Sequence, residues 1–380
     1  MDFYEKMGLS TIINASETYT GLGGSLMDVR TLEAMQQAGR AFVDIGQLIQ
    51  KVGEYAAELT QNEAAHITTG ASGGLVLSAA ACLCGNSEEQ LSRLPDTVGI
   101  QRDEILLFDG SYLDLIPYWK LIGLTGAKIR KVEPTMEAAV AALNEKTAAF
   151  CLFPGKLYET DVPACEQAIP ILKQAGCTVV VDAAAQLPPV SNLWHYTCEL
   201  GADLCIFSGG KHLRGPQSTG LIVGRKALVD MCRLAGCPNA YIGRPYKTGK
   251  EELAGFITAL EIFVKEGGQP LYERQEKQLE RLAMLLQRGG VKDIVCLKEG
   301  RLGTEQPLLH VLLPKGTGKE LNAYTRKLPQ PIDVGVYGDE FGMPENLIFL
   351  NAYNLWDDEL EAVANAVIAY CKEDGANGTD

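Results

Sequence analysis

Several features that would assign a protein to a common functional class are absent from this sequence. Lys and Arg number 34 against 48 Asp and Glu, a net charge of -14. Such a charge repels phosphate backbones, so we do not expect a nucleic acid partner. No apolar run approaches the roughly 18 residues that span a bilayer, and no basic leader precedes an apolar stretch. We therefore expect a cytoplasmic protein with no membrane partner.

Metal-binding and nucleotide-binding patterns are missing as well. No CxxC pair occurs among the 11 cysteines, most of which lie in apolar runs typical of buried, reduced thiols. The GxGxxG pattern fails where Leu26 replaces the third glycine, and GTGKE at 316–320 lacks the Walker glycine and hydroxyl residue. The histidines are scattered at His66, His195, His212 and His310. We expect no metal site.

The middle of the chain alternates short β-rich runs with helical stretches. The near-continuous apolar character of the runs indicates strands buried on both faces, and the alternation predicts an α/β fold with a mostly parallel sheet covered by helices. Ligands then bind at the carboxyl ends of the strands. The runs are AAHITTG (64–70), EILLFD (104–109), AKIRKV (127–132), TAAFCLFP (147–154), CTVVVDAA (177–184) and ADLCIFS (202–208).

Three segments are expected along the chain. Residues 1–60 form an N-terminal segment with helices, 61–250 form a large cofactor-binding domain, and 251–380 form a smaller α+β domain. In the last segment a long charged helix precedes three strand candidates, and a final helix carries one apolar face.

The first strand end is a candidate phosphate site. In ITTGASGGL, a strand runs into a small-residue turn and then into a helix, so backbone N–H groups and the positive end of a helix dipole would face an anion. The alternative is a tight turn that needs small residues only for packing. The turn comprises Gly70, Ala71, Ser72 and Gly73.

Two further strand ends carry charged side chains. Asp182 follows a buried strand in VVVDAAAQLPP, where a carboxylate needs a cation or hydrogen-bond donors. Lys211 follows Ser208 and two glycines, where lost hydration lowers a lysine pKa and makes the amine nucleophilic toward carbonyls. A phosphate turn, a buried carboxylate and such a lysine are together what pyridoxal 5'-phosphate needs. Lys211 would hold the cofactor as a Schiff base, Asp182 would keep its ring nitrogen protonated, and Ser208 would contact its phosphate.

Nearly the whole chain resembles the selenocysteine synthase-like group of fold type I pyridoxal phosphate enzymes, in particular the D-glucosaminate-6-phosphate ammonia-lyase type. The resemblance rests on INASETYTGLGGSLM (13–27), ELTQNEAAHITTGASGGL (58–75), VDAAAQLPP (181–189), FSGGKHLRGPQSTGLIVG (207–224) and IGRPYKTGKEELAGFITALE (242–261).

This resemblance implies an aspartate aminotransferase-like fold with Lys211 and Asp182 as the catalytic residues. It places Ala184 and Gln186 near the cofactor ring. It also suggests that Arg244 and Lys247 bind the anionic end of the substrate, in their own chain or across a subunit boundary; a solvated basic patch is the alternative. The family implies at least a homodimer.

One segment departs from the family pattern. Relatives tend to have Gly-His after the strand equivalent to EILLFD and stack that imidazole on the cofactor ring, whereas this chain has Ser111 and Tyr112 after Asp109-Gly110. Either Tyr112 takes over the stacking or other residues line the ring, and Ser111 is a candidate for substrate contact. True selenocysteine synthases carry a tRNA-binding N-terminal domain, whereas this chain enters the shared INA motif at residue 13, so we do not expect a tRNA substrate.

The predicted reaction is a lyase reaction at Cα and Cβ of a small amino acid or amino sugar acid, with Lys211 taking the Cα proton. Loss of a β-leaving group would give a keto acid and ammonia. Racemisation and β-replacement use the same residues and remain alternatives. A cofactor-binding protein without activity is disfavoured because both Lys211 and Asp182 are present.

Overall fold

The computed structural model describes residues 3–156, 159–267, 269–338 and 341–372. It divides into two compact units, which differ from the expected segments 1–60, 61–250 and 251–380. The large unit is residues 25–267 with 301–304, and the small unit comprises residues up to 24, 268–300 and those from 305 onward. The large unit extends to residue 267 because α11 (Lys250–Glu266) packs against α2 (Val29–Gly39) and α3 (Ile45–Leu59).

The large unit contains the seven-stranded sheet that the alternating pattern predicts. Its strand order is β2-β8-β7-β6-β5-β3-β4, and every pairing is parallel except the two made by β8. The strands are β2 (Ala64–Thr69), β3 (Glu104–Phe108), β4 (Lys128–Val132), β5 (Thr147–Leu152), β6 (Val179–Asp182), β7 (Leu204–Ser208) and β8 (Thr219–Gly224). The six predicted strands are confirmed, whereas β8 lies in a segment that the sequence singles out only as part of a motif.

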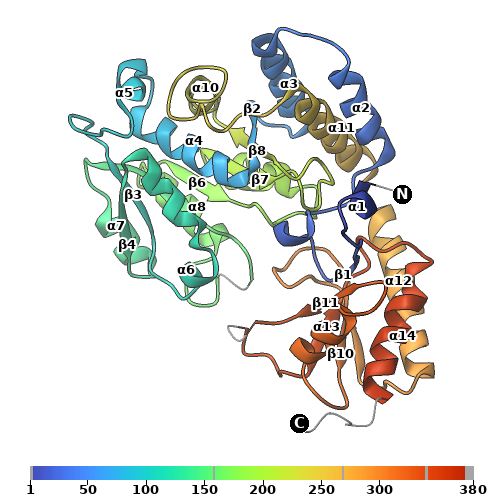
Figure 1. The fold of residues 1–380 in the computed structure, drawn as a ribbon. Helices are drawn as coiled ribbons and strands as arrows, with labels where there is room; N and C mark the ends of the chain where they lie inside the picture. The colour runs from blue at the N-terminus through green and yellow to red at the C-terminus, as the bar shows by residue number, and fades with distance from the viewer. Residues whose placement is uncertain (1–2, 157–158, 268, 339–340, 373–380) are drawn as a thin grey trace. The chain divides into compact units, whose positions relative to one another are not determined.

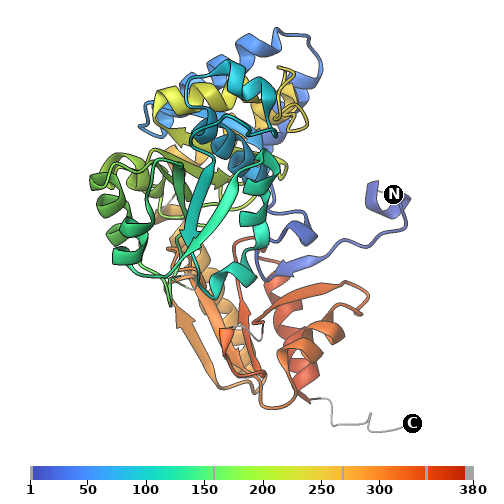
Figure 2. The ribbon, with the colours of Figure 1, turned by 90° about the vertical axis from the view of Figure 1, so that its left-hand side faces the viewer.

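Helices cover both faces of this sheet, as two views of the ribbon show (Figures 1 and 2). The apolar helix α4 (Gly70–Cys84) packs along β2, β8, β7, β6 and β5, and nearly all of its side chains after the first turn are buried. The other helical elements are α5 (Glu88–Arg93), α6 (Tyr112–Leu115), η2 (Pro117–Thr125), α7 (Met136–Ala142), α8 (Cys165–Gln174), α9 (Asn192–Trp194), η3 (His195–Glu199) and α10 (Lys226–Ala235).

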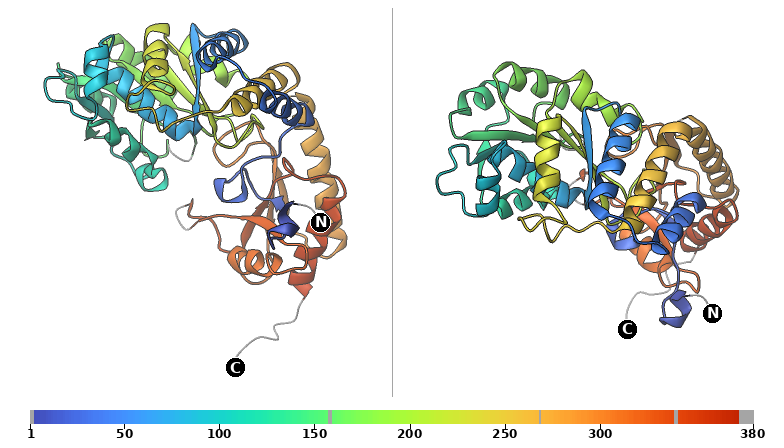
Figure 3. Two further views of the ribbon diagram at one scale, coloured as in Figure 1. Left: turned by 45° about the horizontal axis from the view of Figure 1, so that its top comes forward. Right: turned by 90° about the horizontal axis from the view of Figure 1, so that it is seen from above.

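The small unit combines the two ends of the chain. β1 (Ile13–Ala15) pairs with β11 (Ile332–Val336), and the sheet continues through β12 (Leu347–Leu350), β10 (Leu308–Leu312) and β9 (Ile294–Leu297). The helical elements are α1 (Phe3–Lys6), η1 (Thr20–Leu22), α12 (Gln269–Arg288), α13 (Gly318–Thr325) and α14 (Glu359–Lys372). The long helices α12 and α14 pack side by side (Figures 1 and 3).

Each unit has its own apolar core. In the large unit the core is built from the inner strands, with Phe108, Phe150 and Phe207 almost fully buried. In the small unit Ile13 and Ala15 pack with the C-terminal strands and helices. Across the described ranges, none of the helices combines the length and apolar character needed to cross a membrane.

Candidate active site

The carboxyl ends of β2, β7 and β6 meet along one edge of the seven-stranded sheet. Strand β8 runs antiparallel between β2 and β7, so its first residues, Thr219 and Gly220, pair with Thr69 and Ser208. Asp182 ends β6, which is the next strand beyond β7. The three predicted strand ends therefore lie at one edge, where α/β proteins bind ligands.

The turn that carries Lys211 is held by backbone contacts that require glycine. The Gly209 N–H donates to the Thr219 carbonyl at 2.8 Å. A Cβ at Gly210 would lie 2.4 Å from the Cα of Gln217, which leaves no space for a side chain. The close packing of this turn fixes the backbone of Lys211, whose side chain is half-buried.

Asp182 lies close enough to Lys211 for their charges to interact. Burial raises the pKa of the Asp182 carboxyl from 3.8 to about 6, and both the Ala184 N–H bond and the Lys211 charge partly offset this rise. The Ala184 N–H donates to Oδ1 at 3.1 Å. An ionised Asp182 is therefore costly until a cation faces it, and the protonated ring nitrogen of pyridoxal phosphate is such a cation.

The turn between β2 and α4 has the form expected of an anion site. Gly70 has a φ of 62°, a conformation that favours glycine. The side chain of Thr69 does not cap α4, so it leaves the first-turn N–H groups of the helix to other acceptors. A Cβ at Gly220 would lie 2.4 Å from the Gly70 carbonyl carbon, so glycine at 220 lets the two backbones approach. Ala71 and the exposed Ser72 follow within this turn.

Two buried polar atoms at this edge have no partner in the part of the chain that the structure describes. These are the amide nitrogen Nε2 of Gln186 and the hydroxyl oxygen of Thr68. A buried donor without an acceptor costs roughly 1–3 kcal/mol, which a ligand oxygen would recover. Together with the uncapped helix and the Asp182 carboxyl, they fit pyridoxal phosphate, whose phosphate and ring offer hydrogen-bond acceptors and a cationic nitrogen.

Tyr112 lies in the apolar core instead of facing the edge. Its side chain is 3% exposed, and its hydroxyl donates to the Phe108 carbonyl at 2.7 Å. Its ring packs near Phe153, with centroids 5.9 Å apart. This burial disfavours stacking by Tyr112 and favours the alternative that other residues line the cofactor ring. The neighbouring Ser111 is exposed, and its N–H donates to Asp161 at 2.8 Å.

The segment with Arg244 and Lys247 runs beside the β2–α4 turn. Both side chains are exposed, and the Arg244 guanidinium donates to the Cys237 sulfur at 3.0 Å. Tyr246 lies between these two residues in the sequence and packs against Gly73. A Cβ at Gly73 would lie 3.4 Å from the Tyr246 ring. The structure thus brings this segment to the phosphate turn of its own chain.

Thr248 lies at this edge of the sheet although the sequence patterns did not single it out. Its hydroxyl lies 3.5 Å from that of Thr69, at the start of the phosphate turn. Its only sequence signal was membership of the IGRPYKTGK motif, in which the charged residues are the more obvious candidates.

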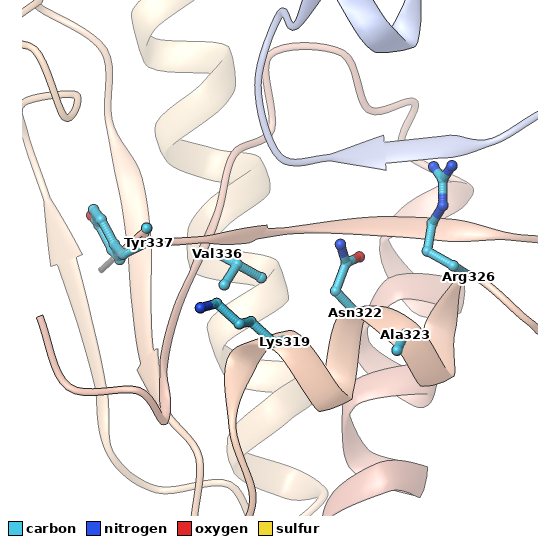
Figure 4. A pocket seen from close by; sticks show the side chains of 7 residues that line it. Lys319, Asn322, Ala323, Arg326, Val336 and Tyr337 are labelled. Carbon is cyan, nitrogen blue, oxygen red and sulfur yellow. The ribbon is translucent and has the colours of Figure 1, made fainter. Parts of the chain in front are cut away.

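A separate hollow of about 440 Å³ lies in the small unit, between α13 and the end of β11. Figure 4 shows Lys319 and Arg326 extending from the two ends of α13, with Asn322 between them. The Arg326 guanidinium lies 3.4 Å from Asp333. None of the residues predicted for the cofactor or the substrate lines this hollow.

Comparisons with known proteins identify relatives of this chain. Residues 102–240 match the family described as Aminotransferase class-V, a range that includes Asp182 and Lys211. The 5'-C-glycyluridine monooxygenase-decarboxylase of a Streptomyces species is 34% identical over 75% of this chain and 70% of its own length. The D-glucosaminate-6-phosphate ammonia lyase of Salmonella typhimurium (strain 14028s / SGSC 2262) is 32% identical over 69% of this chain and 70% of its own length.

The fold is also shared with a solved structure. A structure of D-glucosaminate-6-phosphate ammonia-lyase aligns with 98% of this chain and 100% of its own, with a TM-score of 0.81 and 24% identity. The chain thus has the fold type I architecture that the sequence predicted.

The Gly220→Ala variant tests the phosphate turn. The added Cβ should push Gly70 away and displace the start of α4, and we expect cofactor affinity to fall by about tenfold or more, because charge-assisted hydrogen bonds contribute roughly 1.5–3 kcal/mol. Absorbance titration of cofactor-free protein measures this affinity. Gly123→Ala is the matched control, since its nearest neighbour, the Cδ1 of Ile129, lies at an ordinary 3.6 Å. Equal affinities in both variants would contradict the assignment.

The Asp182→Asn variant tests whether the buried carboxyl makes the stability of the protein depend on pH. Because the folded-state pKa is raised from 3.8 to about 6, the folded cofactor-free protein binds more protons than the unfolded chain in that window, and stability falls as pH rises through it. The amide does not titrate and removes this loss, so the cofactor-free variant should be more stable than the parent at pH 8, by roughly 2–3 kcal/mol, and equal near pH 4. Denaturant unfolding at the two pH values checks this. A variant that is less stable at pH 8 would contradict it.

Proposed function

Because the chain belongs to the selenocysteine synthase-like group of fold type I pyridoxal phosphate enzymes, we propose that it is an ammonia-lyase. The proposed substrate is a small amino acid or amino sugar acid with a leaving group on Cβ, and the products are a keto acid and ammonia. The observation that carries the proposal is the similarity to D-glucosaminate-6-phosphate ammonia lyase over two thirds of both chains.

The residues at the carboxyl ends of the strands have the following proposed roles. The uncapped N-terminus of α4 and the hydroxyl of Ser208 hold the cofactor phosphate, and Gln186 orients the ring. Asp182 keeps the proton on the ring nitrogen. When bound, pyridoxal phosphate withdraws electrons from the Cα of an attached amine.

Lys211 is the proposed acid and base. Its Nζ takes the proton from the substrate Cα, and the pair of electrons left behind expels the β-leaving group. For a β-hydroxyl substrate, one water is lost at Cβ and one is taken up when the C–N bond is hydrolysed. The net change is therefore conversion of the β-hydroxy amino acid into a keto acid and ammonium.

A second candidate function is an oxidative decarboxylation. It is favoured by the similarity to the Streptomyces monooxygenase-decarboxylase, which is as extensive as that to the ammonia lyase. This reaction would consume dioxygen and release carbon dioxide, neither of which the lyase reaction requires.

The proposed reaction predicts which products appear. The purified protein with pyridoxal phosphate is incubated with D- and L-serine, D- and L-threonine and amino sugar acids, and ammonia, keto acid, dioxygen and carbon dioxide are followed. We expect equimolar ammonia and keto acid from at least one compound, without dioxygen uptake. Dioxygen uptake with carbon dioxide release would support the second candidate instead.

Lys211→Ala is the matched variant for this assay. It should lower turnover by at least about a thousandfold, because it removes the base. Borohydride reduction should fix the cofactor on the peptide with Lys211 in the parent alone.

We further propose that the chain acts as a homodimer whose sites are shared. Exposed apolar side chains of the large unit gather in and around α2 and support such a contact. They are Leu26, Val29, Leu32, Phe42 and Val43, of which Phe42 is fully exposed. A two-fold interface would carry two equivalent sites.

Mixing two inactive variants tests the shared site. If Arg244 serves the partner's site, Lys211→Ala and Arg244→Ala subunits exchanged at equal concentration should regain about a quarter of the parental activity, since half the dimers are hybrids with one intact site of two. Sedimentation and a tag on one variant check that subunits exchange. If exchange occurs and no activity returns, Arg244 acts at the phosphate turn of its own chain. If Arg244→Ala is active by itself, Arg244 has no role in the reaction.

A further inference from the structure

The turn that carries Lys211 contains a backbone conformation that is uncommon for its residue type. Arg214 has a φ of 54°, in the left-handed region that favours glycine. Its N–H donates to the Lys211 carbonyl at 3.0 Å, and the Gly215 N–H donates to the Gly209 carbonyl at 2.9 Å. Residues 209–215 therefore form a closed turn that contains Lys211. An arginine kept in a conformation that suits glycine points to a use for its side chain.

The Arg214 side chain bonds to the segment that precedes α2. Its Nε–H donates to the Leu26 carbonyl at 2.7 Å, and a hydrogen bond from a charged donor is stronger than a neutral one. Ser25 contacts the other side of the turn, because its N–H and its hydroxyl donate to the Gly210 carbonyl at 3.0 and 3.2 Å. Residues 25 and 26 thus bond to the turn both before and after Lys211.

The segment 25–26 continues directly into α2, which is held in place by its own contacts. Asp28 caps this helix, since its carboxylate accepts from the Arg30 N–H at 2.9 Å. The Arg30 guanidinium in turn donates to Glu266 at the end of α11 at 2.8 Å, and α2 and α11 pack against each other. The Leu26 carbonyl is therefore presented to Arg214 by a pair of helices that lies outside the sheet.

The Lys211 turn needs such an outside support. The two residues before Lys211 are glycines, which restrain the backbone least. The lysine side chain is a flexible four-carbon stem, so the position of its backbone decides which space Nζ can reach. The bonds from Ser25 and Arg214 supply the restraint that the glycines lack.

We propose that Arg214 is a positioning residue for Lys211. Its guanidinium, bonded to Leu26, holds the turn so that Nζ meets the aldehyde of pyridoxal phosphate. Nζ and the aldehyde carbon then form the C=N bond, and the aldehyde oxygen leaves as water. The inference rests on the proposed function only in that Lys211 carries the cofactor, and it does not depend on which reaction follows.

The test separates attachment of the cofactor from its binding. Cofactor-free protein is mixed with pyridoxal 5'-phosphate, and the rate of C=N bond formation is followed by visible absorbance. Pyridoxine 5'-phosphate is titrated in parallel by fluorescence. It carries an alcohol in place of the aldehyde, so its affinity reports the phosphate and ring contacts without any bond to Lys211.

Arg214→Met keeps a long side chain at the same φ but removes the donor. It should slow bond formation by about tenfold or more and change pyridoxine phosphate affinity by less than about threefold, because a displacement of about 1 Å can slow a positioned reaction by about a hundredfold. Arg214→Gly suits the backbone and also lacks the donor, so it should be slowed to a similar degree. Arg214→Lys, which keeps a charged donor, should recover part of the rate.

Gln61→Gly is the matched control. Gln61 also has a positive φ, 56°, but lies after α3 and outside the Lys211 turn. Glycine at this position should leave the rate and the affinity unchanged. Circular dichroism of every variant checks that its secondary structure is retained.

The other outcomes would overturn the inference. If Arg214→Met forms the bond as fast as the parent, or if rate and affinity fall together, Arg214 does not act by positioning Lys211. A parent that binds pyridoxine phosphate but never bonds to pyridoxal phosphate would overturn the role of Lys211 and this inference with it. If bond formation depends on Arg214 but no compound releases ammonia, the lyase reaction is wrong and the positioning role stands.

Discussion

The site depends on one electrostatic constraint, a carboxylate and an ammonium group at the ends of neighbouring buried strands. Burial raises the pKa of the Asp182 carboxyl above its ordinary value. The hydrogen bond from the Ala184 N–H and the charge of Lys211 lower this pKa in part. A buried carboxylate is stable only with such partners. The parallel pairing of β6 with β7 supplies the geometry, because both strands end at the same edge.

The antiparallel strand β8 is what joins the phosphate turn to this pair. It lies between β2 and β7 and starts at the edge where both of them end. Gly220 lets its backbone approach the first residue of α4. With a bulkier residue at that position, the helix N-terminus could not sit so close to the strand that leads to Lys211.

The groups around this centre decide the reaction, since relatives with different reactions resemble the chain to a similar degree. Asp182 and Lys211 can prepare an attached amine for elimination, racemisation or replacement alike. Choice among these reactions falls to the residues that hold the rest of the substrate and orient its bonds. In this chain we expect those residues to come from the loop after β3 and from the segment with Arg244.

The α/β class, the six strands of the expected sheet and the cofactor could be predicted from the sequence, because buried strands read as apolar runs and the charged residues stand where those runs end. The same patterns identified the residues of the phosphate turn, Asp182 and Lys211 as candidates, whose catalytic roles remain predictions. The unit boundary near residue 267 and the burial of Tyr112 emerged from the folded chain alone. Helix packing and core filling depend on neighbours that are distant in the chain, so no local sequence pattern encodes them. The same is true of the approach of Thr248 to Thr69 and of Leu302 to Lys156.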